Sequence, residues 1–170
     1  VAIVDDNNLG GICLNWGCIP TKSLLKNAEV MDLINTSESY GISVKDIAVD
    51  FESIVSKSVQ ARQRLSKGLH HQVKKHNIDF HAGFGTFTDK NTIMVNDTTI
   101  TAETFIIATG SKPKTLPNLN ASEVVYAKDI FQMKSIPKSI TIIGAGAIGV
   151  EFTYFFNSFG TNVTLFLSLE

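Results

Sequence analysis

The sequence has little cysteine, little proline and no excess of charge of either sign. Two cysteines in 170 residues exclude a disulfide-rich secreted scaffold and favour a special thiol pair in a reducing compartment. The formal net charge of −1 gives no support for a surface that binds nucleic acid or an anionic membrane, because either needs a concentrated basic excess. No uninterrupted apolar run approaches the length of a membrane span. The remaining composition is typical of an ordinary globular protein.

The two ends of the sequence are strand-like and apolar. Residues 1–5 begin without a Met, and residues 162–170 close on a similar run. Natural termini usually have a looser, more polar composition. We therefore expect an interior piece of a longer protein, whose targeting signals would lie elsewhere.

Apolar periodicity predicts alternating helices and strands, and hence an α/β fold. Helices are predicted from Pro20 to a break at Tyr40-Gly41, over residues 51–76, near 129–133 and over 147–159. Buried strands are predicted at 1–5, 104–111 and 139–143, with a further strand at 162–167. Between them, segments 79–82, 85–88, 92–95 and 98–101 alternate with a period of two, which predicts a small antiparallel meander.

A glycine-rich run follows the strand predicted at 139–143 and opens a helix. It reads GAGAIG: Gly144, Ala145, Gly146, Ala147, Ile148 and Gly149. In a strand–turn–helix context the first glycine makes the turn, the second lets a pyrophosphate approach, and the third allows close helix–strand packing. The alternative is a glycine-rich turn that binds nothing. Leu167 occupies the position at which an acidic residue would hydrogen-bond the ribose hydroxyls, and a Leu side chain accepts no hydrogen bond. The next acidic residue, Glu170, comes later in the sequence.

Both cysteines, Cys13 and Cys18, lie in the segment GGICLNWGCIP before a predicted helix. Five residues of regular helix advance about 7.5 Å, more than the Cα separation of about 7 Å that a disulfide tolerates. A bond therefore needs an irregular turn, which Asn15, Gly17 and Pro20 suit. So short a loop makes a poor structural staple, whereas a helix N-terminus lowers the pKa of a thiol. These facts favour a dithiol that opens and closes.

Two other interpretations of the cysteines stay open. They could be buried and inert, since free cysteine often packs as a small hydrophobe. A metal site would need further ligands, but no His lies near in sequence and the spacing matches no zinc knuckle, so we expect no metal.

The segment LGGICLNWGCIPTKSLL resembles the redox-active disulfide segment of the FAD-dependent pyridine nucleotide–disulfide oxidoreductases. The runs IIATGS and GAGAIGVEF recur in that family in the same order, so the resemblance spans essentially the whole chain. The residues of the cysteine segment are most similar to those of family members that oxidise dihydrolipoyl groups. Related reductases tend to have Val where this chain has Trp16, and glutathione reductases usually have Lys-Lys where it has Thr21-Lys22.

The resemblance implies catalytic roles for four residues. Cys13 would be the interchange thiol that attacks and releases the dithiol substrate, and Cys18 would lie next to the flavin and pass on the electron pair. Lys22, one turn further, would lie near the flavin ring, where Glu151 would pair with it. Without the resemblance, Lys22 could equally be a surface lysine and Glu151 a first-turn residue favoured by the helix dipole.

The resemblance also implies a set of cofactor contacts. Asp5 would hold the FAD adenosine ribose, where the family usually has Glu, and Gly85 would present its backbone to the adenine. The remaining FAD residues would be Gly10 and Gly11 at the pyrophosphate, Ile12 beside them, and Thr109, Gly110 and Ser111 at the crossing between domains. The run 144–149 would serve NAD, and Glu151, as the partner of Lys22, would also belong to the cofactor-binding residues together with Cys13 and Cys18.

The expected organisation is an FAD-binding domain at residues 1–136, lacking its N-terminal strand and Gly-rich turn, followed at 137–170 by the first βαβ unit of an NAD-binding domain. The resemblance implies a homodimer that serves lipoyl-bearing carrier domains of 2-oxoacid dehydrogenase complexes, in the bacterial cytoplasm or the mitochondrial matrix. Two alternatives stay open: a sibling reductase for glutathione-like or mercuric substrates, and a non-catalytic nucleotide-binding fragment. The fragment is expected to be inactive alone, since the family's domain with the catalytic His is absent from it.

Overall fold

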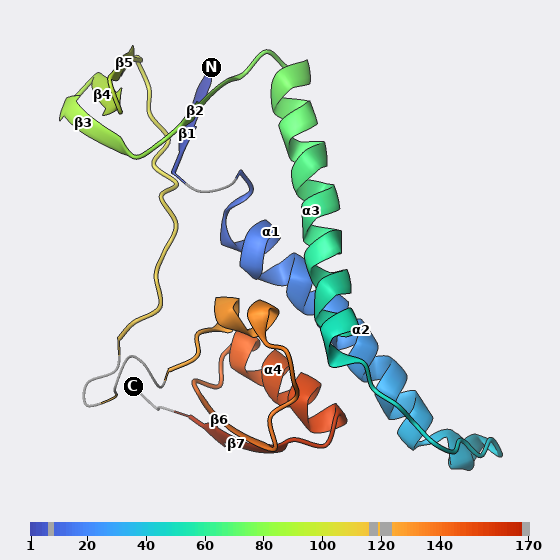
Figure 1. Ribbon diagram of the computed structural model, residues 1–170. Helices are drawn as coiled ribbons and strands as arrows, with labels where there is room; N and C mark the ends of the chain where they lie inside the picture. The colour runs from blue at the N-terminus through green and yellow to red at the C-terminus, as the bar shows by residue number, and fades with distance from the viewer. Residues whose placement is uncertain (7–8, 116–118, 120–123, 168–170) are drawn as a thin grey trace.

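The computed structural model describes residues 1–6, 9–115, 119 and 124–167, and it shows an α/β chain (Figure 1). The helices are α1 (Gly11–Trp16), α2 (Cys18–Asn35), α3 (Phe51–Lys75) and α4 (Ala147–Ser158), with 3-10 turns η1 (Ser37–Tyr40) and η3 (Ala127–Gln132). The strands are β1 (Ala2–Asp5), β2 (Asp79–Ala82), β3 (Gly85–Asp89), β4 (Thr92–Val95), β5 (Thr98–Thr101), β6 (Ser139–Ile143) and β7 (Asn162–Phe166). The long helices and the β6–α4–β7 unit match their predictions closely, whereas α1 was not predicted.

The strands form three small sheets among the described residues: parallel β1–β2, antiparallel β3–β4–β5 and parallel β6–β7. The predicted four-stranded meander is therefore wrong at its first strand, because β2 pairs with β1. The amides of Asp79 and Gly83 donate to the carbonyls of Val1 and Asp5, so the backbone groups of β2 are used by β1. The meander that remains has three strands.

Helices α2 and α3 begin where local chemistry favours it. Pro20 lies in the first turn of α2, where its missing N–H costs little. The carboxylate of Asp50 accepts a hydrogen bond of 2.9 Å from the amide of Ser53 and so caps α3, and Lys74 and Lys75 occupy its last turn. Both helices thus start on signals that the sequence carries, and α3 also ends on one.

The hydrophobic core lies where α2, α3, η3 and α4 meet. Its buried members are Leu24, Ala28, Phe51, Val55, Ile130, Phe152, Phe155 and Phe156. Phe155 is at its centre, with ring centroids 6.3 Å from Phe51 and 5.2 Å from Phe156. The core therefore joins residues from both sides of the domain boundary expected at 136/137.

All three predictions of buried strands are corrected. Residues 104–111 form no strand, and Ile106 is 92% exposed. An apolar run becomes a buried strand only when neighbouring strands pair with it, and none of the described strands does. Strands β1 and β6 are only partly covered: in β6, Ile140 and Ile142 are half-buried while Ile143 is exposed. A two-stranded sheet with a helix on one face leaves the other face open.

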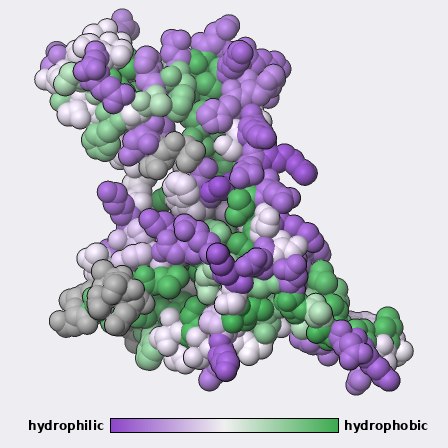
Figure 2. All heavy atoms as spheres, viewed as in Figure 1, coloured by the Kyte–Doolittle hydropathy of each residue, from purple (hydrophilic) through white to green (hydrophobic). Residues whose placement is uncertain are grey.

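The surface carries apolar side chains at one end of the molecule. Figure 2 shows hydrophobic residues around the end of α2 and the segment that follows it, where Leu33, Tyr40 and Ile42 are exposed. No helix among the described residues combines the length and the apolar character needed to span a membrane.

Candidate redox and nucleotide site

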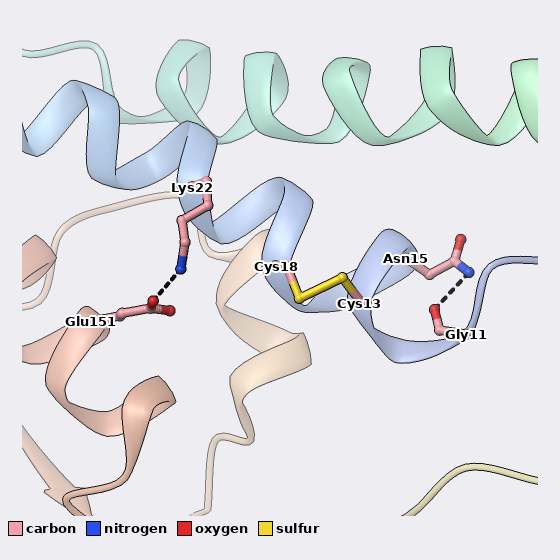
Figure 3. The surroundings of a disulfide bond; sticks show 6 residues. All are labelled: Gly11, Cys13, Asn15, Cys18, Lys22 and Glu151. Carbon is pink, nitrogen blue, oxygen red and sulfur yellow. Dashed lines mark hydrogen bonds and ion pairs between the residues drawn. A yellow bond between two sulfur atoms is a disulfide. The ribbon is translucent and has the colours of Figure 1, made fainter.

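A disulfide joins Cys13 and Cys18 across the junction of two helices (Figure 3). Cys13 lies within α1, and Cys18 is the first residue of α2. Their Cα atoms are 4.6 Å apart, well below the spacing of five residues of regular helix. The chain is therefore irregular between them, as a bond at this spacing requires.

Gly17 is the point of irregularity. It separates α1 from α2, with φ −123° and ψ −116°. A Cβ at this position would lie 2.9 Å from the carbonyl oxygen of Ile12 and 3.1 Å from Cα of Cys13. Because both neighbours are backbone atoms, only glycine lets the start of α2 approach α1 this closely.

Lys22 and Glu151 form an ion pair one helical turn beyond the disulfide (Figure 3). Lys22 is on α2 and Glu151 is on the first turns of α4, so the expected pairing is present. The lysine side chain is 60% exposed and the glutamate 24%, so water screens the pair on one side. The contact links the helix that carries Cys18 to the helix that follows the glycine-rich turn.

A second polar contact between the same helices involves Tyr154 of α4 and Asp32 of α2. The hydroxyl of Tyr154 donates a hydrogen bond to the Asp32 carboxylate, which raises the pKa of Tyr154 above its ordinary value. Partial burial and the negative charge of Asp32 act in the same direction. The α2–α4 packing therefore includes a polar edge beside the phenylalanine core.

Asn15 and Arg62 also belong to the disulfide region, and sequence reasoning did not identify them as site residues. Asn15 is buried between the two cysteines, and its side-chain amide donates to the carbonyls of Leu9, at 3.2 Å, and Gly11, at 2.9 Å. Arg62 of α3 donates from Nη1 to the backbone oxygen of Asn15 at 3.2 Å. The only sequence signal was the placement of Asn15 in a turn; nothing local marks Arg62, 47 residues away.

The glycine-rich turn between β6 and α4 has the shape that a dinucleotide needs. Gly144 has φ +107°, which disfavours other residues. A Cβ at Gly146 would meet nothing within 4 Å, so the space in front of the α4 N-terminus is open. A Cβ at Gly149 would lie 1.8 Å from the Gly144 oxygen, so this glycine is required for close packing. The residues present therefore fit a pyrophosphate at this helix start.

Residues on the side expected to hold FAD follow β1. Asp5 ends that strand, and Gly10 and Gly11 both have positive φ, of 106° and 60°. A Cβ at Gly11 would meet nothing within 4 Å, which leaves this turn open to a close-approaching group. Gly85 begins β3 beside β1, where a Cβ would lie 3.3 Å from Val4. These residues fit a nucleotide that passes the end of β1.

Three further expectations concern exposed positions. Thr109, Gly110 and Ser111 are exposed and lie in the segment 104–111, which forms no strand. No hydrogen bond or ion pair shown for the described residues joins them to the disulfide. Leu167 follows β7 and is 64% exposed, so no carboxylate stands at that place. Glu170 lies outside the described residues. In the described part of the chain, no three His, Cys, Asp or Glu side chains are placed to share a metal ion.

The fold and the site define a class of protein: a disulfide at the junction of two helices, packed beside a βαβ unit with a glycine-rich turn of the dinucleotide-binding type. The comparison with known families agrees. The family described as pyridine nucleotide-disulphide oxidoreductase matches residues 1–170, and the chain belongs to this family.

Similar curated proteins carry the name dihydrolipoyl dehydrogenase. The chain is 39% identical to the one from Acholeplasma laidlawii over 97% of its own length and 51% of that protein. It is 36% identical to the one from Chlorobaculum tepidum and 40% to the one from Mycobacterium bovis, over 96% of the chain in each case. It covers 36% and 37% of those two proteins, so it spans about half or less of these relatives.

Proposed function

We propose that the full protein is a flavoprotein that oxidises dihydrolipoyl groups with NAD⁺ through the Cys13–Cys18 pair. The observation that carries the proposal is the disulfide itself, closed across the junction of two helices and followed at once by an ion pair to the nucleotide-type unit. The relatives named dihydrolipoyl dehydrogenase support this choice of substrate.

The thiol chemistry follows from the positions of the two sulfurs. A substrate thiolate attacks Sγ of Cys13, the Cys13–Cys18 bond breaks, and Cys18 leaves as a thiolate. The second substrate thiol then attacks the substrate sulfur of the mixed disulfide and releases Cys13. Two electrons have then passed from the substrate to the protein, which holds a Cys18 thiolate and a Cys13 thiol. One substrate proton was released when the attacking thiolate formed, the other ends on Cys13, and the substrate leaves as a cyclic disulfide. Cys18 begins α2, where the positive end of the helix dipole favours a thiolate.

FAD, when bound, would accept the electron pair from the dithiol and pass it to NAD⁺ as a hydride equivalent. Asp5, Gly10, Gly11 and Gly85 would hold FAD, with Ile12 and residues 109–111 completing its site. The run 144–149 would hold the NAD pyrophosphate. Lys22 and Glu151 would keep a charged pair beside the flavin.

This function assigns residues 1–136 to an FAD-binding domain and 137–170 to the start of an NAD-binding domain. The partners would be lipoyl-bearing carrier domains of 2-oxoacid dehydrogenase complexes, and the enzyme would be a homodimer. A thiol pair that cycles needs a reducing compartment, which the bacterial cytoplasm or the mitochondrial matrix provides.

Steady-state assays of the full-length protein test the proposal. We expect rapid reduction of NAD⁺ with dihydrolipoamide and little reduction of oxidised glutathione by NADPH. Cys13→Ser and Cys18→Ser should each lower dihydrolipoamide oxidation to background, while Thr161→Ser, a conservative change away from the disulfide, should leave it intact. Preference for glutathione, or full turnover in the Cys18→Ser variant, would contradict the assignment.

A further inference from the structure

The turn between the two cysteines is held from inside by Asn15. The residue is only 4% exposed, and its side-chain amide bridges the carbonyls of Leu9 and Gly11 at the entry to α1. This contact fixes how the chain enters the short helix that carries Cys13. The Asn15 side chain does not by itself hold the C-terminal end of α1, which is the end nearer to Cys18 in the sequence.

The end of α1 is held from outside by Arg62. The backbone oxygen of Asn15 lies in the last turn of α1. Nη1 of Arg62 donates to this oxygen at 3.2 Å. The bond is partly buried and crosses from α3, which runs beside α1 and α2 (Figure 3). A guanidinium is well suited to a helix C-terminus, because its charge complements the exposed carbonyls.

We propose that Arg62 is a positioning residue for the redox pair. Asn15 lies two residues after Cys13 and three before Cys18, so a clamp on its carbonyl ties the segment between the two thiols to the rigid helix α3. When the disulfide is open, this clamp keeps the sulfurs close together and raises their effective concentration for closing. Arg62 therefore stabilises the disulfide relative to the dithiol. The inference rests on the redox role proposed for Cys13 and Cys18.

The direction in which the thiol–disulfide equilibrium shifts when Arg62 is replaced distinguishes a clamp from a purely electrostatic effect. A cation that acted only through its field would stabilise the reduced thiolate, so its removal would favour the disulfide. A clamp predicts the reverse: its removal favours the dithiol. The chain offers a matched control in Arg64, which is exposed on the same helix and has the same charge.

The test is the thiol–disulfide equilibrium of the full-length protein in glutathione redox buffers. In the reaction, the Cys13 and Cys18 thiols reduce one glutathione disulfide to two glutathione molecules. Samples are quenched by alkylation, and the fraction of each cysteine that is alkylated is read by peptide mass spectrometry.

We expect Arg62→Met to shift the equilibrium about tenfold toward the dithiol, which is about 30 mV for a two-electron couple. Arg62→Lys should shift it less, since a lysine keeps a donor and the charge. Arg64→Met should leave it unchanged. No shift in Arg62→Met, or a shift toward the disulfide, would overturn the clamp. If Arg62→Met does not fold, Arg62→Ala decides, because it also removes the donor while alanine favours the helix: a shift toward the dithiol supports the clamp and its absence refutes it.

The same experiment distinguishes this inference from the proposed function. If the protein oxidises dihydrolipoamide normally but its thiol–disulfide equilibrium is unchanged by substitution of Arg62, only the clamp is disproved. A disulfide that dihydrolipoamide never reduces would disprove the proposed function, whatever Arg62 does.

Discussion

The Lys22 ammonium pairs with the Glu151 carboxylate across 129 positions of sequence and joins α2 to α4. The pair lies one turn beyond Cys18 and at the start of the helix that follows the glycine-rich run. It is thus a polar contact that connects the helix beginning at Cys18 to the nucleotide-type unit. Its exposure limits what it contributes to stability, so its position is more informative than its strength.

We expect Lys22→Met and Glu151→Gln to separate stability from turnover. A double-mutant cycle on unfolding should give a coupling below about 1 kcal/mol that falls further with added salt, because the lysine is largely exposed. Turnover of dihydrolipoamide in the full-length protein should fall in both single variants by more than this coupling explains. The control is Lys26→Met, which breaks an exposed pair with Glu29 on α2 and should leave turnover unchanged. Unchanged turnover in Lys22→Met would remove Lys22 from the proposed site.

Glycine substitutions test why the disulfide can close. Gly17→Ala places a Cβ against backbone atoms of Ile12 and Cys13, so we expect a loss of about 1–3 kcal/mol in unfolding free energy and a less stable disulfide. Gly68→Ala is the matched change in an exposed helix interior, where a Cβ would meet nothing within 4 Å. It should gain up to about 1 kcal/mol. Denaturant unfolding of both variants in parallel gives the comparison, and a Gly17→Ala protein as stable as the parent would contradict the packing argument.

Local signals predicted the elements that depend on local chemistry. Helix α3 was predicted within one residue, because its apolar period is contained in its own sequence. The β6–α4–β7 unit was predicted equally well, since glycine spacing and apolar runs specify a strand–turn–helix without reference to the rest of the chain.

The errors concern contacts between distant residues. The pairing of Ala2 with Asp79 joins strands more than seventy positions apart, and no pattern in either strand names its partner. Residues 104–111 have the composition of a buried strand. Burial also requires strands that pair with the segment and side chains that cover it, and the composition of the segment does not reveal whether these are present. Arg62 was missed for the same reason: its role comes from the packing of α3 on α1, while its own sequence surroundings are those of a solvated helix face.

The pKa of Tyr154 tests the packing of α2 on α4. Its hydroxyl donates to Asp32, which raises the pKa above the ordinary 10.0, so the neutral phenol is favoured in the folded protein. Because the folded pKa is the higher one, the stabilisation is complete below pH 10 and is lost as the pH rises through the folded pKa.

The ionisation of this phenol is isolated by subtracting the alkaline absorbance titration of the Tyr154→Phe variant from that of the parent protein. We expect Asp32→Asn to lower the pKa of Tyr154 toward 10.0, because the carboxylate's hydrogen bond and charge are both removed. Glu29→Gln should lower it only slightly, since Glu29 is the smallest of the causes. An ordinary pKa in the parent would contradict the contact between Tyr154 and Asp32.

Two glycines of the 144–149 run separate nucleotide binding from folding. At Gly146 the backbone, with φ −72°, suits any residue and the space beside it is open, so Gly146→Ala should fold with unchanged stability. If NAD binds at this turn, the new methyl group occupies the space that the pyrophosphate needs, and NAD⁺ affinity should fall by about tenfold or more. Gly149→Ala should instead destabilise the fold, because its Cβ would overlap the Gly144 oxygen. Calorimetric titration of NAD⁺ and thermal unfolding of the full-length variants measure the two effects separately. Normal NAD⁺ affinity in a folded Gly146→Ala protein would mean that the nucleotide does not bind at this turn, and the assignment of residues 137–170 to an NAD-binding unit would then be wrong.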